Sequence, residues 1–148
     1  MNIEEHIKTQ SKLPASRRLI LSVLVSANSM NEKVTEALKP FDISIQQFNV
    51  LRILRGQKGK PANLGTIQER MVSKMSNTTR LVDKLIAKGL TKRVICPENR
   101  RKVEISITPE GLEFLEQVDP VVASVEAEIT SAFSEAQMNQ LSEELSKL

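Results

Sequence analysis

The spacing of hydrophobic residues changes from a helical to a strand-like period at Gly89. Before it, apolar residues recur at three- and four-residue steps over residues 74–88, which predicts a helix with Gly89 in the left-handed C-cap position. After it, apolar and polar residues alternate over residues 102–107, and residues 91–95 suit a partner strand. We expect residues 96–101 to form the tip of this hairpin.

A shorter helix precedes this one closely. Asn63 is a good N-cap for a helix over residues 64–70, and residues 71–73 are expected to form a tight connection to the helix that begins at Lys74. Two helices joined so closely and followed by a hairpin predict a winged helix-turn-helix. The apolar side of the second helix is expected to comprise Met75, Leu81, Val82, Leu85 and Ile86.

Long amphipathic segments flank this unit. Pro14 predicts the start of a first helix and the Lys39-Pro40 step its end, while Ser44 and Gln47 form a capping box that opens a second helix. The fold class is therefore mainly α, with a two-stranded wing as its minor β part. We assign residues 41–108 to the winged helix-turn-helix and residues 1–40 and 109–148 to a dimerisation domain.

The C-terminal helices show clear start signals. Thr108 and Pro109 predict the start of a fifth helix, which Pro120 should kink or break, and Ser134 with Gln137 predicts the start of a last helix. The terminal helices carry more apolar surface than a three-helix core can cover, which favours a two-fold dimer. The predicted dimerisation residues are Leu112, Leu115, Val118, Val122, Met138, Leu141 and Leu145.

Basic residues are concentrated in the middle of the chain. Between Leu51 and Ile107 there are 14 Lys or Arg and 4 Asp or Glu, a net charge of +10, whereas the rest of the chain has 7 against 14, a net charge of −7. Such a localised cationic face is typical of nucleic-acid binders. A basic face that only aids solubility would explain the charge alone, so the arrangement of the charges must decide.

Short polar residues open the helix that begins near Lys74. A recognition helix needs such side chains at its start, because long ones would hold its backbone away from the base edges of the major groove. A helix start that merely caps itself would explain one such residue rather than four in succession. The predicted contacts to double-stranded DNA from this region are Gln68, Ser73, Lys74, Ser76, Asn77, Thr78, Thr79, Arg80 and Lys84.

Two arginines lie at the predicted hairpin tip. A wing beside a recognition helix reaches the neighbouring minor groove, whose negative potential attracts arginine. We predict that Arg101 enters this groove, that Arg100 contacts a phosphate and that Asn99 supports the wing through a hydrogen bond. The reverse order of the two arginines is the alternative, and a solvated turn is the other interpretation of the pair.

Several function classes find no support in the sequence. A single cysteine, Cys96, and a single histidine, His6, offer neither a disulfide nor a cluster of metal ligands. We find no nucleophile-base pair and no glycine-rich phosphate loop, so we expect no enzyme, no cofactor and no metal. No apolar run reaches the roughly 18 residues that a membrane helix needs, and the start lacks a secretory signal, so we expect a cytoplasmic protein with no membrane partner.

The chain resembles the multiple antibiotic resistance regulator (MarR) family over nearly its whole length and in the right order. The resemblance rests on the segments Asp42–Leu51, Thr79–Leu85, Lys88–Leu90, Arg93, Asn99–Arg101 and Ile107–Gly111. It implies a winged-helix homodimer whose terminal helices form the interface and which binds pseudo-palindromic DNA. It also implies that DNA is often released when a small, commonly aromatic, effector binds between the dimerisation and DNA-binding parts.

Two positions bear on this resemblance. The family usually has an acidic residue where Asn99 stands, and a neutral amide weakens the tether to the wing arginine. Cys96 does not match the N-terminal cysteine of the peroxide-sensing branch, and we interpret it as an incidental small residue. The alternative is a thiol that the nearby Arg93, Arg100 and Arg101 make reactive. The residues that hold an effector are unknown from sequence, because a pocket between helices is lined by the same residue types as a core.

These observations together predict a regulator of transcription, a repressor, that occupies operator duplex as a homodimer and responds to a small aromatic molecule. The alternative is a winged helix that serves as a protein-binding module, in which the same basic face docks an acidic partner. Salt-dependent binding to duplex DNA distinguishes these two hypotheses.

Overall fold

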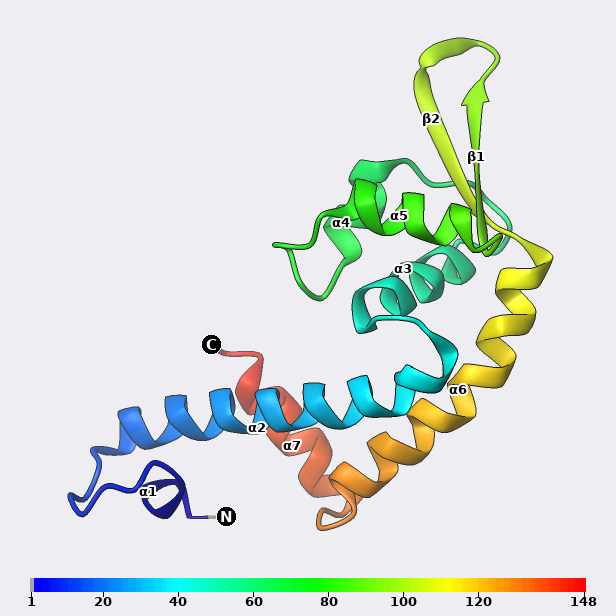
Figure 1. The fold of residues 1–148 in the computed structure, drawn as a ribbon. Helices are drawn as coiled ribbons and strands as arrows, with labels where there is room; N and C mark the ends of the chain where they lie inside the picture. The colour runs from blue at the N-terminus through cyan, green and yellow to red at the C-terminus, as the bar shows by residue number, and fades with distance from the viewer. Residues whose placement is uncertain (1) are drawn as a thin grey trace.

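The computed structural model describes residues 2–148 and confirms the mainly helical fold class, with 63% of the chain in helices. The elements follow one another as α1 (Ile3–His6), α2 (Ala15–Leu38), the 3-10 turn η1 (Lys39–Phe41), α3 (Ile45–Gly56), α4 (Leu64–Arg70), α5 (Thr78–Ala87), β1 (Thr91–Cys96), β2 (Asn99–Ile107), α6 (Pro109–Thr130) and α7 (Glu135–Leu145) (Figure 1).

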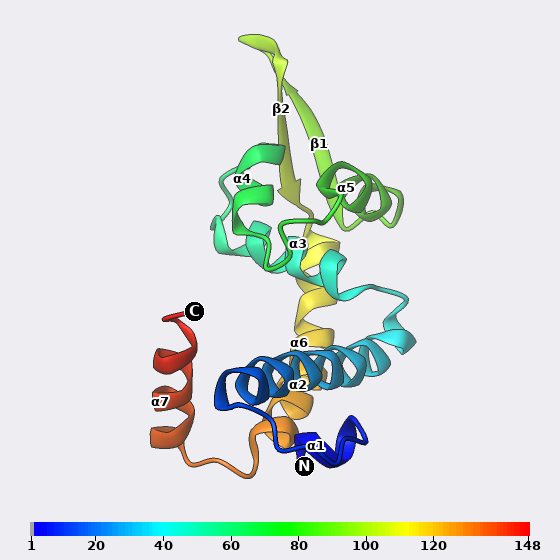
Figure 2. The same ribbon diagram turned by 90° about the vertical axis from the view of Figure 1, so that its left-hand side faces the viewer.

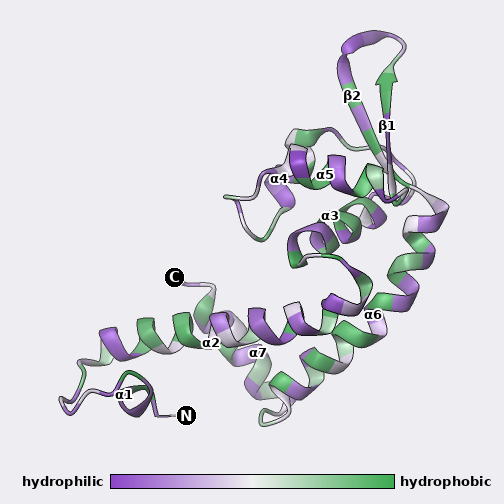
Figure 3. Cartoon of the chain, viewed as in Figure 1, coloured by the Kyte–Doolittle hydropathy of each residue, from purple (hydrophilic) through white to green (hydrophobic). Residues whose placement is uncertain are grey.

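The molecule has two ends joined by α6. Helices α3, α4 and α5 gather at one end, from which the β1–β2 hairpin projects, and α2 and α7 lie at the other end (Figures 1 and 2). Hydrophobic residues recur in bands along α2 and α6, as expected for amphipathic helices (Figure 3). No helix within residues 2–148 combines the length and the apolar character needed to cross a membrane.

The helix starts follow from local hydrogen bonds that the sequence predicts. Ser44 and Ser134 each form a complete capping box with the glutamine three residues later. The Asn63 side chain accepts a hydrogen bond from the backbone N–H of Thr66 at 2.8 Å, which opens α4 as predicted. Each cap satisfies a backbone donor that the helix itself leaves unpaired.

The predicted start of the recognition helix at Lys74 is wrong, because α5 begins at Thr78. Asn77 is its N-cap and accepts a hydrogen bond from the backbone N–H of Arg80 at 3.1 Å. The residues before it instead form a turn over 71–77, the α4–α5 turn, in which the Ser76 N–H donates to the Ser73 carbonyl. The prediction failed because the helical spacing of apolar residues extends to the N-terminal side of the true cap, Asn77, and so does not mark where the helix begins.

Of the two outcomes predicted for Pro120, a kink or a break, the break does not occur, since α6 runs without interruption from Pro109 to Thr130. The proline ring is on the exposed side of the helix, where water can solvate the carbonyl that loses its donor. On the opposite side, Leu115, Val118 and Val122 are buried and hold the helix against the core. This packing outweighs the local cost of the proline.

The same burial corrects part of the predicted dimer interface. Leu115 and Val118 are fully buried and Val122 is 2% exposed, and all three belong to the single hydrophobic core of the chain. They therefore pack within the chain itself and are not available for contact with a second copy. Leu112 on α6 and Leu141 on α7 remain well exposed. Helix α6 therefore turns one face to the core and another, which includes Leu112, to solvent.

The hairpin is longer than predicted, and it recruits a third short segment. The strands reach Cys96 and Asn99, so Pro97 and Glu98 alone form the turn. At its base, Ala62 exchanges two backbone hydrogen bonds with Ile105, at 2.8 and 2.7 Å. Sequence patterns did not predict this bridge, because a single residue has no period to recognise. It anchors the wing to the loop that precedes α4.

A cluster of charges ties α3 to α6. Asp119 on α6 accepts hydrogen bonds from Arg55 and from Arg52, the latter at 3.4 Å, and the Arg52 guanidinium also lies 4.6 Å from the centre of the Phe48 ring. Burial raises the pKa of Asp119, but the hydrogen bonds and charges of the two arginines outweigh it and lower the pKa overall. The carboxylate is therefore favoured in the folded state.

We expect the stabilising effect of Asp119 to depend on pH. Because its pKa is lower in the folded chain than the ordinary 3.8, its contribution is complete above that value and is lost as the pH falls below it. Asp119→Asn should lower the free energy of unfolding by about 1 kcal/mol at pH 7 and by less near pH 3. Urea unfolding at the two pH values measures this. Glu113→Gln, an exposed position on the same helix, is the control and should change neither value.

Candidate nucleic-acid interface

The start of α5 presents a polar and cationic surface. Asn77, Thr79, Arg80 and Lys84 are all exposed, and Ser76 is partly exposed. Asn77 caps the helix by accepting a hydrogen bond from the Arg80 N–H, so these exposed side chains lie around a defined helix start. Hydroxyls, amides and cations at a helix start are well suited to contact an anion or a base edge.

Two of the predicted contacts have an internal role instead. Thr78 is only 6% exposed, and its hydroxyl donates to the side-chain carbonyl of Gln68 on α4. The amide of Gln68 in turn donates to the backbone carbonyl of Lys74 at 2.6 Å. The prediction that Thr78 reads the groove is therefore wrong, and Gln68 is used to hold α4, the turn and α5 together. The pattern of short polar residues did not distinguish inward from outward hydroxyls.

The α4–α5 turn is fixed at both ends by further hydrogen bonds. The Lys74 ammonium donates to the backbone carbonyl of Glu69 at the end of α4. The Val72 N–H donates to the side-chain carbonyl of Asn49 on α3 at 3.0 Å. Ser73 and Lys74 remain exposed on this turn. The turn is thus a defined structure rather than a free loop.

An open hollow of about 430 Å³ lies beside the start of α5. We call it the α5 hollow; it is lined by Gln46, Ser73, Met75, Ser76, Asn77, Arg80, Leu81 and Lys84. Gln46, on the first turn of α3, was not predicted as part of the site. The sequence did contain an indication of this role, because Gln46 lies next to a capping box and therefore in the first turn of a helix. Exposed polar residues in that turn are common at phosphate contacts.

The wing carries its arginines on a bulge. The strands pair Ile95 with Val103 but Cys96 with Asn99, so residues 100–102 of β2 lie between two pairs that are adjacent on β1. Arg100 and Arg101 are both exposed there. The Asn99 side chain accepts a hydrogen bond from the Arg101 backbone N–H at 3.1 Å. Asn99 therefore shapes the backbone of the bulge, as its predicted supporting role requires, rather than binding a guanidinium.

An ion pair joins the wing to the recognition helix. Arg93 on β1 donates to the carboxylate of Asp83 on α5, with 2.6 Å between Nη2 and Oδ1. This contact was not predicted from the sequence, although the opposite charges on a helix and on the strand that follows it could have indicated it. Because both groups are substantially exposed, the pair orients the two elements more than it stabilises the fold.

The other end of α5 is tied to the turn before α3. Lys88 donates to the carboxylate of Asp42 at 2.8 Å and also to its backbone carbonyl. The hydrogen bond and charge of Lys88 lower the pKa of Asp42. Asp42 has a positive φ of 50°, a conformation that aspartate tolerates better than most residues. Helix α5 is thus held at its start by Gln68 and at its end by Asp42.

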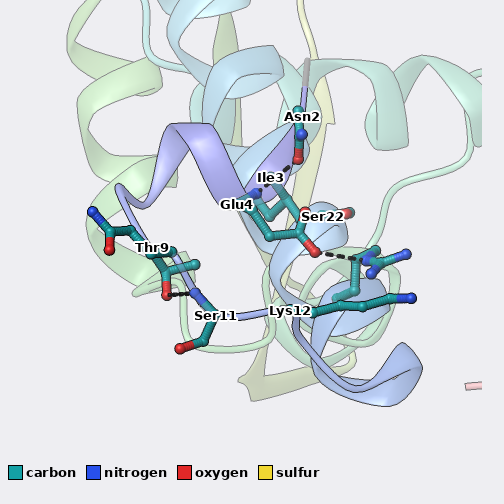
Figure 4. A pocket seen from close by; sticks show the side chains of 9 residues that line it. Asn2, Ile3, Glu4, Thr9, Ser11, Lys12 and Ser22 are labelled. Carbon is teal, nitrogen blue, oxygen red and sulfur yellow. Dashed lines mark hydrogen bonds and ion pairs between the residues drawn. The ribbon is translucent and has the colours of Figure 1, made fainter.

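A second hollow lies at the opposite end of the molecule, around α1 and the start of α2. Its volume is about 500 Å³, and Figure 4 shows Glu4, Thr9, Ser11 and Lys12 among the side chains that line it. The Arg18 guanidinium donates to Glu4 at 2.9 Å. The backbone hydrogen bond of Glu4 is the main cause that lowers its pKa, aided by Arg18. The hollow is remote from the wing, and its charged residues Glu4 and Arg18 pair with each other. We therefore treat it separately from the α5 surface.

Metal binding finds no geometric basis in the described chain, residues 2–148. No three or more His, Cys, Asp or Glu side chains gather there in a way that could hold an ion. Cys96 is partly exposed on β1 next to the hairpin turn.

Comparison with known proteins places this surface in context. A family model described as the MarR family matches residues 43–103, which include α3, α4, α5 and most of the wing. The uncharacterized HTH-type transcriptional regulator YkoM of Bacillus subtilis (strain 168) is 30% identical over 119 residues, which are 79% of this chain and 71% of that protein. The chain spans slightly less than two thirds of the length of the first curated relatives that it matches, 64% and 65%.

Solved structures share the fold. A mutant of MarR from E. coli, complexed with operator DNA, is 24% identical, with a TM-score of 0.75 over 84% of this chain and 89% of that one. BpsR of Bordetella bronchiseptica, solved to explain the regulation of its DNA binding by 6-hydroxynicotinic acid, is 18% identical, with a TM-score of 0.78 over 88% of this chain and 97% of that one. At these identities the likeness concerns the fold alone.

Proposed function

The chain belongs to the MarR family, and from this premise we propose that it regulates transcription by binding double-stranded operator DNA. The observation that carries the proposal is the exposed surface formed by the start of α5 and the bulge of the wing. It presents Arg80 and Lys84 next to short polar side chains, and Arg100 and Arg101 lie on the hairpin that Arg93 ties to α5. A recognition helix and a wing have this composition when they read duplex DNA.

Helix α5 is proposed to enter the major groove. Ser76, Asn77 and Thr79 approach the base edges, and Arg80 reaches a guanine edge or a phosphate. Lys84, one turn further along, contacts the backbone, as do Ser73 and Lys74 from the α4–α5 turn. Gln68 and Thr78 are proposed to act indirectly, since their hydrogen bond sets the position of α5.

The wing is proposed to contact the adjacent minor groove. Arg101 enters the groove and Arg100 contacts a phosphate, because a narrow minor groove attracts a guanidinium most strongly at its floor. Asn99 holds the backbone at Arg101 and so limits the conformations of the bulge. Such a fixed bulge reduces the entropy that binding would otherwise cost.

We propose that the DNA-binding form of the protein is a homodimer. Large apolar side chains are exposed on α2, α6 and α7, and a monomer leaves them in water; they are Leu19, Ile20, Leu24, Leu112, Leu141 and Leu145. Met138, on the same helix as Leu141, is partly buried. A two-fold dimer through these helices would cover such surfaces and place two α5 helices one DNA turn apart, which suits a pseudo-palindromic site.

Repression and its relief are the proposed outcome of this binding. A dimer on operator DNA blocks access to the promoter, and an effector that favours a different spacing of the two α5 helices releases it. We propose a small aromatic molecule as the effector. The fold shared with BpsR, whose DNA binding is regulated by 6-hydroxynicotinic acid, supports this choice.

We expect the protein to bind a duplex, selected in vitro from a randomised pool, with an affinity that falls steeply as the salt concentration rises. Arg80→Ala should relax the preference for one base pair by about 1–3 kcal/mol. Lys84→Ala should weaken binding to all sequences alike and reduce the salt slope by about 1. Fluorescence anisotropy over a salt series measures both effects.

Lys147→Ala is the control for these variants, because it removes a cation from the C-terminal end, where Lys147 pairs with Glu144 at 2.8 Å. It should bind every duplex as the unmodified protein does. If no duplex is retained at low salt, or if Arg101→Ala leaves affinity and salt slope unchanged, the surface does not read DNA. Salt-dependent capture of an acidic protein instead would favour a protein-binding module.

A further inference from the structure

Two large apolar side chains project from the α4–α5 turn into solvent. Met75 is 95% exposed and Val72 is 90% exposed, more than any other large hydrophobic side chain in the part of the chain that the structure describes. Met75 was predicted to lie on the buried side of the recognition helix, and that prediction is wrong. An apolar residue held so far out of the core, next to a binding surface, suggests a contact partner.

The position of Met75 on the binding surface distinguishes it from the similarly exposed Val72. Met75 lines the α5 hollow together with Asn77, Arg80 and Lys84, whereas Val72 does not. Figure 1 shows the turn projecting from the helices at the start of α5. The hydrogen bond from Gln68 to the Lys74 carbonyl fixes the backbone immediately before Met75. An ordered turn therefore presents this side chain beside the residues proposed to read base edges.

The partner must be apolar at one point and polar or anionic around it. Asn77, Arg80 and Lys84 line the same hollow as Met75, and a purely apolar partner surface would have to bury the two cations without compensation. The major groove of DNA meets both demands, because the 5-methyl group of thymine stands among hydrogen-bonding base edges and phosphates. Methionine is flexible enough to follow such a methyl group.

We propose that Met75 packs against the 5-methyl group of a thymine in each half-site and so helps to determine which operator sequence is preferred. The inference rests on the proposed function, since it assumes that α5 enters the major groove. Burial of one methyl-sized group stabilises a complex by about 0.8 kcal/mol, which corresponds to a roughly fourfold change in affinity. This contact adds specificity for thymine at a base pair with which Arg80 need not form a hydrogen bond.

Deoxyuridine substitution tests the contact, because it removes only the 5-methyl group of a thymine. Each thymine of the duplex selected from the randomised pool is replaced in turn, and the dissociation constant is measured by fluorescence anisotropy. With the unmodified protein, we expect a roughly fourfold loss of affinity at one position in each half-site and little change elsewhere. Met75→Ala should bind the thymine and uracil duplexes equally at that position.

Val72→Ala is the matched control, since it shortens an equally exposed apolar side chain of the same turn that lies outside the α5 hollow. It should keep the fourfold response to uracil. The proposal is overturned if the unmodified protein shows no uracil response, or if Met75→Ala retains it. Failure to bind any duplex would contradict the proposed function itself, which is a different result from binding that is indifferent to the methyl group.

Discussion

Gly111→Ala is expected to lower the free energy of unfolding by about 3 kcal/mol. A Cβ atom at this position would lie 2.6 Å from Cγ1 of Ile107 and 3.2 Å from the carbonyl carbon of Leu90, and closer still to the carbonyl oxygen of Leu90. The opposing atoms include backbone, which cannot rotate away. That backbone also accepts a hydrogen bond from the Thr108 N–H at 3.1 Å, so α6 and the start of the wing would have to separate.

Urea unfolding followed by circular dichroism measures this loss. Gly56→Ala is the matched control, because it adds the same methyl group at the end of α3, where no described atom other than those of adjacent residues and of the nearby α3 backbone lies within 4 Å of the new Cβ. Alanine favours helix over glycine, so this variant should be as stable as the unmodified protein or slightly more stable. Equal stability of the two variants would show that α6 does not pack as closely on Leu90 as described.

The second large effect is expected at Leu115. Its side chain is fully buried in the core, and Leu115→Ala should cost about 3 kcal/mol by removing buried atoms and leaving a cavity. Because Leu115 packs within one subunit, the mutation should leave the dissociation constant of the proposed dimer nearly unchanged. Urea unfolding and sedimentation equilibrium measure the two quantities separately.

Leu141→Glu provides the contrast. Leu141 is 45% exposed on α7, so a charge there should leave the fold of each subunit intact but oppose burial between two subunits. We expect a monomer by sedimentation and weak DNA binding, since one α5 helix can then engage only one half-site. A dimer that persists in Leu141→Glu but dissociates in Leu115→Ala would reverse our assignment of the two residues.

Much of the fold follows from local signals. The capping boxes at Ser44 and Ser134, the cap at Asn63 and the proline at the start of α6 all act within one helical turn. The hydrogen bonds concerned link residues three positions apart, so a short stretch of sequence contains both partners. The alternation of β2 is equally local, which is why its assignment was confirmed while its exact ends were not.

The candidate site was predictable in type but not in detail. The cationic segment and the Asn99-Arg100-Arg101 segment were found from the sequence, and the structure shows that Arg80, Lys84 and residues 99–101 are exposed. The inward hydroxyl of Thr78 and the outward side chain of Met75 were not found. The Asn77 cap starts α5 at residue 78 and leaves Met75 in the preceding turn, while the contact with Gln68 on α4 holds the Thr78 hydroxyl inward.

The sequence alone thus determined the order of the elements, most of their boundaries and the location of the positive charge, because period, caps and composition act over a few residues. Only the tertiary structure decided which apolar face each helix buries. Leu115 lies in the core rather than at the surface because α2 and α3, whose residues are far away in the chain, pack against α6. Such long-range packing also decides whether Met75 faces the core or the solvent, and therefore what it is free to contact.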